Sequence, residues 1–283
     1  MKPKGLWLAV AVFVVFAIVF GTADWQISEA LYNPQAGWAL FMEAYGQLPA
    51  ALLGFVSGSV LLRQHAWQKN FKSILAGVGI VLVTLVATFG FFADAAGAQT
   101  GNEDMNLALL AGLTLAALVV GQVLLRRMPR EKLAPYHALA KIGLGMFFFA
   151  GLATVWLVKL PWGRWTYRDI LEAGDPGLYT PWFLPQGPNG HHSFFSGHTA
   201  MCFLILPLML LAKPGSPARR ALLALVLMWG VAGAISRVMV GAHFASDVLF
   251  GAGETLLWFW ILQKAYLPQA AQQPTPQTTP GQA

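Results

Sequence analysis

Eight apolar segments of nearly membrane-spanning length constrain this chain more than any other feature of its sequence. A helix that crosses the hydrocarbon core of a bilayer needs about 20 mostly apolar residues. A membrane-crossing helix also satisfies its own backbone hydrogen bonds. The pattern therefore predicts an all-α, polytopic membrane helix bundle with about eight transmembrane helices. The predicted spans are 6–22, 47–62, 73–92, 107–125, 138–158, 199–212, 220–236 and 245–263.

The composition agrees with this class and excludes others. Hydrophobic residues make up 57% of the 283 residues, charged residues 11%, and the mean hydropathy is +0.57. These values exclude a water-soluble globule. The net charge of +6 comes from basic residues between apolar runs, so it does not indicate a nucleic-acid partner. Cys202 is the single cysteine, which excludes an internal disulfide and a thiolate metal site.

The chain divides into three parts. Residues 1–72 are predicted to hold the N-terminal spans, with an amphipathic helix over 23–46 in the outer interface. The first apolar run could instead be a signal peptide, but its length and its weak cleavage site favour a membrane span. Residues 73–267 form the predicted membrane core. The tail 268–283, rich in Gln, Pro and Thr, is predicted to be disordered and cytoplasmic.

The basic residues orient the predicted spans. With both termini in the cytoplasm, the inner loops hold most of the Lys and Arg residues, as the positive-inside rule requires. Four cations remain at the outer face, together with four histidines. Such a concentration of charge against the rule predicts a multiply charged anionic ligand. The cations are Lys159, Arg164, Arg168 and Arg237, and the histidines are His191, His192, His198 and His243.

The stretch from Ser236 to Asp247 holds residues suited to nucleophilic chemistry. His243 and Asp247 are four residues apart at the start of a predicted helix, so their side chains should lie one turn apart on one face. A carboxylate that accepts the Nδ1 proton leaves Nε2 of the histidine as a nucleophile or base. Arg237 could bind phosphate oxygens. The alternative is that Arg237 and Asp247 only cap two helix ends.

A long outer loop precedes the sixth predicted span. It begins at Lys159 and ends at Ser196-Gly197-His198, where the next helix should start. Free backbone N–H groups at a helix N-terminus, with a glycine that permits close approach, suit an anion. The alternatives are that Ser196 is an ordinary N-cap and Lys159 a snorkelling lysine at the end of a span.

Three further features within the predicted spans predict structural roles. Gly54 and Gly58 form a GxxxG pattern that serves either packing within one chain or a dimer interface. Pro207 predicts a kink in the sixth span. Glu254, deep in the last span, is expected to form a hydrogen bond inside the bundle, with a proton or ion path as the alternative.

The order and spacing of these motifs resemble the type-2 phosphatidic acid phosphatases, membrane lipid phosphatases related to vanadium haloperoxidases. The signature of that family ends in Ser-Arg, five residues, His, three residues and Asp, which matches Ser236-Arg237…His243…Asp247. The middle motif is present as Phe195-Ser196-Gly197-His198, with Phe195 in place of proline. The first motif departs further, because Thr166 stands seven residues after Lys159 where the family has arginine.

The resemblance implies a six-helix phosphatase core and a role for each matched residue. His243 would attack phosphorus, Asp247 would hold its tautomer, and His198 would protonate the leaving oxygen. The remaining matched groups would bind phosphate oxygens, and no metal or other cofactor is implied. These are Lys159, Arg164 or Arg168, Ser196, Gly197 and Arg237.

A site at the outer interface predicts a membrane lipid phosphate as the substrate. The candidates are phosphatidylglycerophosphate, undecaprenyl diphosphate, phosphatidic acid and a lipid A phosphate. The expected location is the inner (plasma) membrane, with the active site on the periplasmic or extracellular side. Two other functions stay open: a lipid phosphotransferase that uses the same site, and a non-catalytic lipid-phosphate binding or transport protein, which the missing arginine at Thr166 motivates.

Overall fold

A computed structural model describes residues 3–100 and 106–267 of the chain. Every regular element in these residues is a helix, which confirms the all-α prediction. The tail 268–283, predicted to be disordered, lies outside the described residues.

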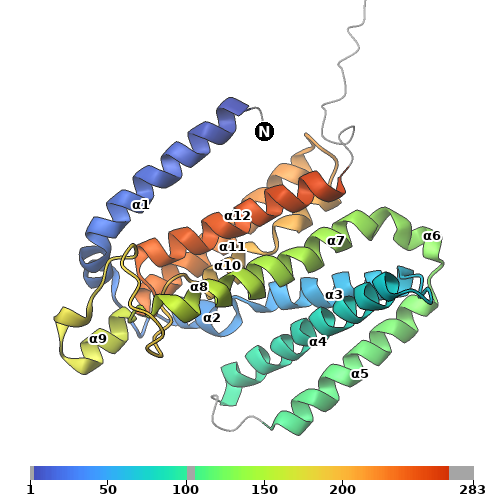
Figure 1. Cartoon of the computed structure of the whole chain (residues 1–283), viewed down its shortest axis with the longest axis horizontal. Helices are drawn as coiled ribbons and strands as arrows, with labels where there is room; N and C mark the ends of the chain where they lie inside the picture. The colour runs from blue at the N-terminus through green and yellow to red at the C-terminus, as the bar shows by residue number, and fades with distance from the viewer. Residues whose placement is uncertain (1–2, 101–105, 268–283) are drawn as a thin grey trace, which may run out of the picture.

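The helices run in the order shown in Figure 1. The longer ones are α1 (Pro3–Leu31), α3 (Leu48–Gln64), α4 (Phe71–Thr100), α5 (Leu107–Arg126), α7 (His137–Met146), α11 (Pro217–Met239) and α12 (Ala245–Tyr266). The shorter ones are α2 (Gly37–Tyr45), α6 (Arg130–Leu133), α8 (Thr154–Trp162), α9 (Tyr167–Ala173) and α10 (Gly197–Phe203). A π-helix, η3 (Phe147–Ala153), joins α7 to α8, and a 3₁₀-helix, η5 (Leu206–Leu211), follows α10.

Seven stretches of helix in the described residues are long and apolar enough to cross a membrane. The chain is therefore a multi-pass membrane protein. Two of these stretches contain several consecutive helices: Gly37–Gln64 holds α2 and α3, and Arg130–Ala173 runs from α6 to α9. The stretches are Trp7–Leu31, Gly37–Gln64, Phe71–Gly97, Leu107–Arg126, Arg130–Ala173, Pro217–Met239 and Ala245–Tyr266.

The predicted sixth span, 199–212, is shorter than expected. The α-helix α10 ends at Phe203, and the 3₁₀-helix η5 begins with Pro207 in its first turn. Proline has no N–H to donate and disrupts an α-helix at this point. The interruption expected at Pro207 is confirmed, and it divides the segment into two short helices. Leu204 and Leu206 are buried, so the divided segment lies inside the bundle.

The interfacial helix predicted over 23–46 is wrong in its first half. Residues 23–31 continue α1, and α2 is a separate short helix. Helix α1 continues past the polar residues Asp24 and Ser28. Both side chains are fully buried and point into the protein, not toward the membrane interface. The amphipathic pattern therefore reflects a helix with polar groups facing the bundle.

Glycines bring α3 close to α4. A Cβ atom on Gly58 would lie 1.9 Å from Oγ1 of Thr84, and one on Gly54 would lie 2.8 Å from Cβ of Ala87. Only glycine leaves room for this approach. The GxxxG pattern thus packs two helices of one chain.

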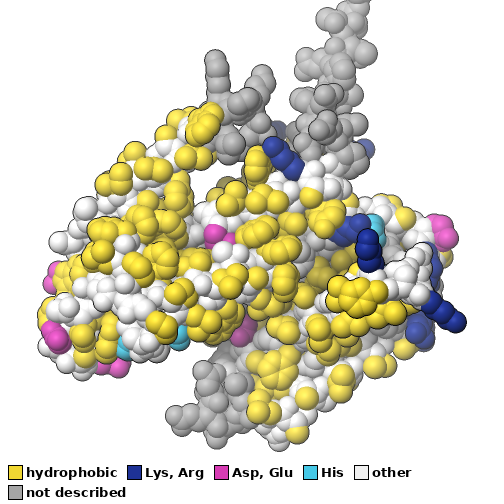
Figure 2. All heavy atoms as spheres, in the orientation of Figure 1, with side chains coloured by type: hydrophobic (Ala, Val, Ile, Leu, Met, Phe, Trp, Pro, Cys, Tyr) yellow, Lys and Arg dark blue, Asp and Glu magenta, His cyan; other side chains and the backbone are white. Residues whose placement is uncertain are grey.

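The apolar core lies between α3, α7, η5, α11 and α12, with Ile142, Met146, Leu204 and Val226 almost fully buried in it. Helix α1 packs along α12, and α2 packs against α11 (Figure 1). In the face seen in Figure 2, the Lys and Arg side chains gather toward the end that carries α6, while acidic side chains gather around α9.

Candidate active site

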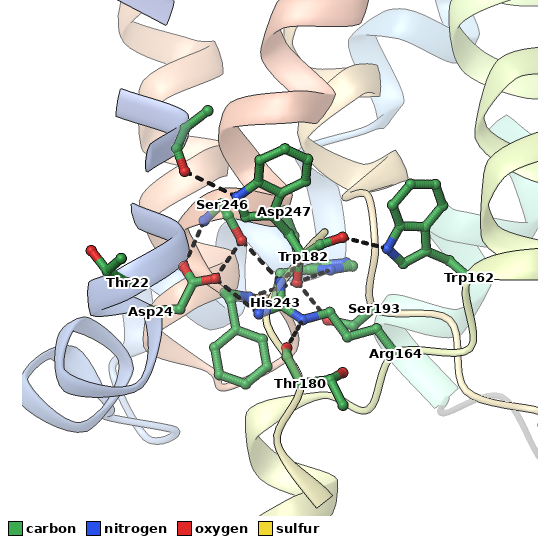
Figure 3. Close-up of polar contacts among 12 residues, drawn as sticks. Thr22, Asp24, Trp162, Arg164, Thr180, Trp182, Ser193, His243, Ser246 and Asp247 are labelled. Carbon is green, nitrogen blue, oxygen red and sulfur yellow. Dashed lines mark hydrogen bonds and ion pairs between the residues drawn. The ribbon is translucent and has the colours of Figure 1, made fainter. Parts of the chain in front are cut away.

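The residues of the three motifs converge at the end of the bundle near α9. Lys159 lies at the end of α8, His198 at the start of α10, Arg237 at the end of α11, and Asp247 at the start of α12. His243 lies in the turn between α11 and α12 (Figure 3). The helices thus bring together motifs that are about 80 residues apart along the chain.

His243 is buried and faces Asp247. It lies two residues before α12 begins, so it is not on the helix itself as the sequence suggested. Its Nδ1 atom is 3.8 Å from Oδ2 of Asp247, longer than a hydrogen bond, and has no hydrogen-bond partner in the described residues. Burial lowers the pKa of His243 to about 4; the positive charges of Lys159 and Arg237 act in the same direction, and Asp247 opposes them. The imidazole is therefore neutral at pH 7.

The carboxylate of Asp247 is held by three donors. Its Oδ2 atom accepts from Oγ of Ser193 at 2.6 Å and from the backbone N–H of Phe244 at 2.8 Å. Its Oδ1 atom accepts from Nη1 of Arg164 at 2.5 Å. A fully buried carboxylate with three donors keeps its charge and its orientation. Asp247 is thus fixed beside His243.

Arg164 is buried among acceptors and does not lie free at the mouth of the site. Gly163 makes this possible, because it ends α8 with a φ of 63°, and a Cβ atom there would lie 2.0 Å from the carbonyl oxygen of Gly187. Besides Asp247, the guanidinium donates to Thr180, Ser246 and Asp24. All three of its nitrogens are therefore engaged by the protein (Figure 3).

Asp24 on α1 completes this buried network. It accepts from Nη2 of Arg164 at 2.8 Å, from the backbone N–H of Ser246 at 2.8 Å, and from Oγ of Ser246. Arg164 and both of its carboxylate partners are at most 1% exposed. The first helix of the chain is thus tied by an ion pair to the residues that support His243.

Lys159 and Arg237 are the two cations that act on His243. Nζ of Lys159 donates to the carbonyl oxygen of His192 at 2.6 Å. The side chain of Arg237 is 9% exposed, and its Nε atom has no hydrogen-bond partner in the described residues. A buried N–H group without an acceptor is costly. Both cations therefore suit an anion bound next to His243.

Arg168 and Arg237 share one carboxylate, that of Glu43 on α2. Oε1 of Glu43 is 2.9 Å from Nη1 of Arg237 and 3.5 Å from Nη1 of Arg168. Thr166, at the position of the missing family arginine, caps α9 by accepting from the N–H of Asp169 at 3.2 Å. The two arginines near Thr166 thus differ: Arg164 faces inward to two carboxylates, and Arg168 lies at the edge of the site.

The Ser196-Gly197-His198 motif begins α10, as expected. Ser196 is the N-cap, and its hydroxyl accepts from the N–H of Thr199 at 3.2 Å. Its own N–H donates to the backbone oxygen of Asp247 at 3.1 Å, so this amide is already used. Nε2 of His198 lies 2.8 Å from the carbonyl oxygen of Met42. Because a carbonyl only accepts, Nε2 carries a proton and Nδ1 is the atom left for chemistry.

Sequence reasoning did not assign a function to Asp24, Glu43, Ser193 or Ser246. Asp24 and Glu43 lie in the segment 23–46, outside the spans predicted from the sequence. The structure places each within a helical stretch long enough to cross a membrane, where an acid is a signal of function. Glu254 gave the same signal, but neither of its carboxylate oxygens has a hydrogen-bond partner in the described residues, so the expected hydrogen bond is not found.

A separate cavity of about 590 Å³ lies at the other end of the bundle, between α3, α4, α7 and α12. Its polar lining includes Gln64, His137 and Lys141. None of the motif residues lines this cavity. Within the described ranges, no group of three or more His, Cys, Asp and Glu residues could hold a metal ion.

The candidate site thus combines buried cations with a histidine and a carboxylate at one end of a helical membrane bundle. Residues 138–269 match the model of the PAP2 superfamily. The match runs from α7 to the end of α12 and confirms the resemblance drawn from the motifs. No curated protein and no solved structure matches the chain in the corresponding comparisons.

Proposed function

We propose that this membrane protein is a lipid phosphatase that hydrolyses a phosphomonoester or diphosphate of a lipid at the outer face of the membrane. The observation that carries the proposal is the buried, neutral imidazole of His243 between the carboxylate of Asp247 and the cations Lys159 and Arg237. A neutral imidazole is nucleophilic, and fixed cations stabilise the charge of a transferring phosphoryl group. The outer location follows from the distribution of basic residues.

In the first step, the lone pair of His243 Nε2 forms a bond to phosphorus. The bond from phosphorus to the lipid oxygen breaks, and its electron pair stays on that oxygen. The oxygen takes a proton from Nδ1 of His198. Because Nε2 of His198 donates to Met42, this transfer requires the imidazolium form; burial lowers the pKa of His198 to about 3, so the negative charge of the bound phosphate must stabilise that form. The positive charge on the phosphorylated imidazole is then opposed by Asp247.

In the second step, water attacks the phosphohistidine. His198, now neutral at Nδ1, takes a proton from the water, and the bond between nitrogen and phosphorus breaks. The electron pair returns to Nε2 of His243, and inorganic phosphate leaves. No group outside the chain and the two substrates is needed to balance either step.

The contacts also assign different roles to the four cations. We assign the phosphate oxygens to Lys159 and Arg237, with support from Arg168 and the amide of Gly197. Arg164 is instead a positioning residue, because it donates to Asp24 and Asp247. Of the two arginines that could replace the one missing at Thr166, Arg168 is the one available to substrate.

The test is release of phosphate by the purified full-length protein in detergent from a panel of lipid phosphates. We expect His243→Ala to lower kcat by about a thousandfold or more, because the nucleophile is lost. The matched control is His137→Ala, since His137 lies at the other end of the bundle, beside Gln64. Equal rates for His243→Ala and the wild type would contradict the proposal.

The same assay separates the two other functions. Phosphate recovered on an added alcohol acceptor instead of in water would indicate a phosphotransferase. Tight binding of lipid phosphates without any release, by folded protein, would indicate a binding or transport protein.

A further inference from the structure

Glu43 places a negative charge among the cations of the proposed phosphate site. Its Oε1 atom lies 2.9 Å from Arg237 and 3.5 Å from Arg168. The exposed fraction of the side chain rises from 9% for Arg237 to 31% for Glu43 and 43% for Arg168. Glu43 therefore lies between an inner arginine and an outer one.

The charges of this group suit one phosphate better than two. Lys159, Arg168 and Arg237 supply three positive charges and Glu43 supplies one negative charge, which leaves two positive charges. The fourth cation, Arg164, has two carboxylate partners, Asp24 and Asp247, so this network lowers the total to one positive charge. A phosphate monoester carries a charge of about −1.5 to −2 at pH 7. A lipid diphosphate carries more negative charge and needs more cations around it.

The position of Glu43 adds to this match. The reacting phosphate must lie beside His243 and Arg237. The second phosphate of a lipid diphosphate is part of the leaving group, so it extends outward from there. Arg168 would be its natural partner, but the carboxylate of Glu43 lies between the two arginines. The second phosphate would therefore meet a like charge, which repels it.

We propose that Glu43 makes this site selective for lipids that carry a single phosphate over lipids that carry a diphosphate. The inference rests on the proposed function, because it takes Arg237 and Lys159 as the phosphate ligands. It adds a specificity residue from α2, which lies outside the residues that match the superfamily. A different role for Glu43, simple competition with any phosphate for Arg237, would affect both substrates equally.

The test compares farnesyl monophosphate with farnesyl diphosphate, which differ by one phosphate and share one chain. The quantity measured is the ratio of kcat/KM for the two substrates in the wild type and in Glu43→Gln. We expect Glu43→Gln to shift this ratio toward the diphosphate by about tenfold, the effect of removing one charge at the rim of a partly solvated site. An unchanged ratio, or an equal gain for both substrates, would overturn the inference.

Two further variants make the result specific. Asp169→Asn removes a carboxylate of similar exposure, 36% against 31%, from the neighbouring helix α9, where Asp169 lies 3.9 Å from His191. We expect it to leave the ratio unchanged. The double variant Glu43→Gln/Arg168→Gln should lose the gain for the diphosphate, because the freed Arg168 is what binds the second phosphate. Persistence of the full gain in the double variant would contradict the assignment of Arg168.

A binding measurement separates failure of this inference from failure of the proposed function. The dissociation constants of inorganic phosphate and pyrophosphate are measured by calorimetry with full-length wild-type and Glu43→Gln protein. If neither farnesyl substrate is hydrolysed, the proposed function fails, and the ratio of these two constants decides the inference alone. A shift of about tenfold toward pyrophosphate in Glu43→Gln supports it, and equal ratios refute it.

Discussion

Two pairs of helices outside the superfamily match relate to the site in different ways. Helices α1 and α2 send polar groups into it: Asp24 binds Arg164, Glu43 binds Arg237, and the carbonyl oxygen of Met42 binds His198. Helix α5 packs on α3 and α4, and α4 packs mainly on α3 and also touches α2 and α7. The buried hydroxyls of α4 and α5 donate to carbonyl oxygens one turn back in their own helix, as in Thr88 and Thr114.

The difference lies in where a buried polar group finds its partner. A threonine whose hydroxyl donates a hydrogen bond within its own helix packs like an apolar residue and needs no hydrogen-bond partner from another helix. A buried carboxylate cannot be satisfied within its own helix and must find donors elsewhere. Asp24, which is fully buried, and Glu43, which pairs with two arginines, therefore mark the N-terminal pair as part of the site, whereas Asp94 in α4 is only partly buried. The superfamily match begins only at residue 138.

The largest effect that would test this comparison comes from removing the charge of Asp24. We expect Asp24→Asn to lower kcat by about a hundredfold, because Arg164, left with Asp247 as its only charged partner among the described residues, would shift Asp247 away from its position beside His243. Loss of a buried ion pair should also lower the free energy of unfolding by about 3 kcal/mol. Rates of phosphate release at a temperature where the variant is folded, with thermal unfolding in parallel, would measure both.

The matched control is Asp94→Asn, which makes the same chemical change in α4. It should leave kcat unchanged, since Asp94 lies on α4, whose main contacts are with α3 and α5. If the two variants had equal kcat, the distinction between the helix pairs would fail. Because Asp24 does not reach the proposed phosphate ligands directly, KM should stay close to its wild-type value in both variants.

A second, intermediate effect is the dependence of activity on pH. Only neutral His243 is nucleophilic, so with its pKa lowered to about 4 we expect kcat/KM to fall below about pH 4 and not near the ordinary value of 6.5. A pH profile of phosphate release from pH 3.5 to 8 would show this limb. An acid limb near pH 6.5 would mean that water or a neighbouring charge keeps His243 protonated.

The same shift has a consequence for stability. The unfolded chain protonates this histidine near pH 6.5, whereas the folded protein does so only near pH 4. Acidification between these values therefore favours the unfolded chain, and the contribution of His243 to stability is complete above about pH 6.5 and declines as the pH falls toward 4. Thermal unfolding of the wild type and His243→Ala across this range would isolate that contribution.

The smallest effect on activity should come from the interface between α3 and α4. Gly58→Ala places a methyl group 1.9 Å from Thr84 Oγ1, so the two helices must separate. We expect a lower unfolding temperature, through overpacking that costs about 1–3 kcal/mol, with kcat of the folded protein unchanged. A loss of activity larger than the loss of folded protein would show that the peripheral pair also supports the site.

Much of the fold and part of the site could be predicted from the sequence. The all-α bundle followed from apolar segments whose length matches a bilayer, a property of local composition. The spacing of His243 and Asp247 predicted that they face each other, and they do, although His243 lies in a turn before the helix. The short sixth segment and the extension of α1 to Leu31 were missed, because they depend on which neighbours bury each side chain.

The sequence alone determined the class of protein, the side chains capable of phosphoryl chemistry and their approximate gathering at one membrane face, because length, polarity and spacing act locally. Only the tertiary structure decided how they divide their roles. Arg164 and Arg168 stand two residues on either side of Thr166, but one is buried between Asp24 and Asp247 and the other lies at the rim beside Glu43. That choice depends on carboxylates more than 80 residues away in sequence, which only the packing of α1, α2 and α12 brings within reach.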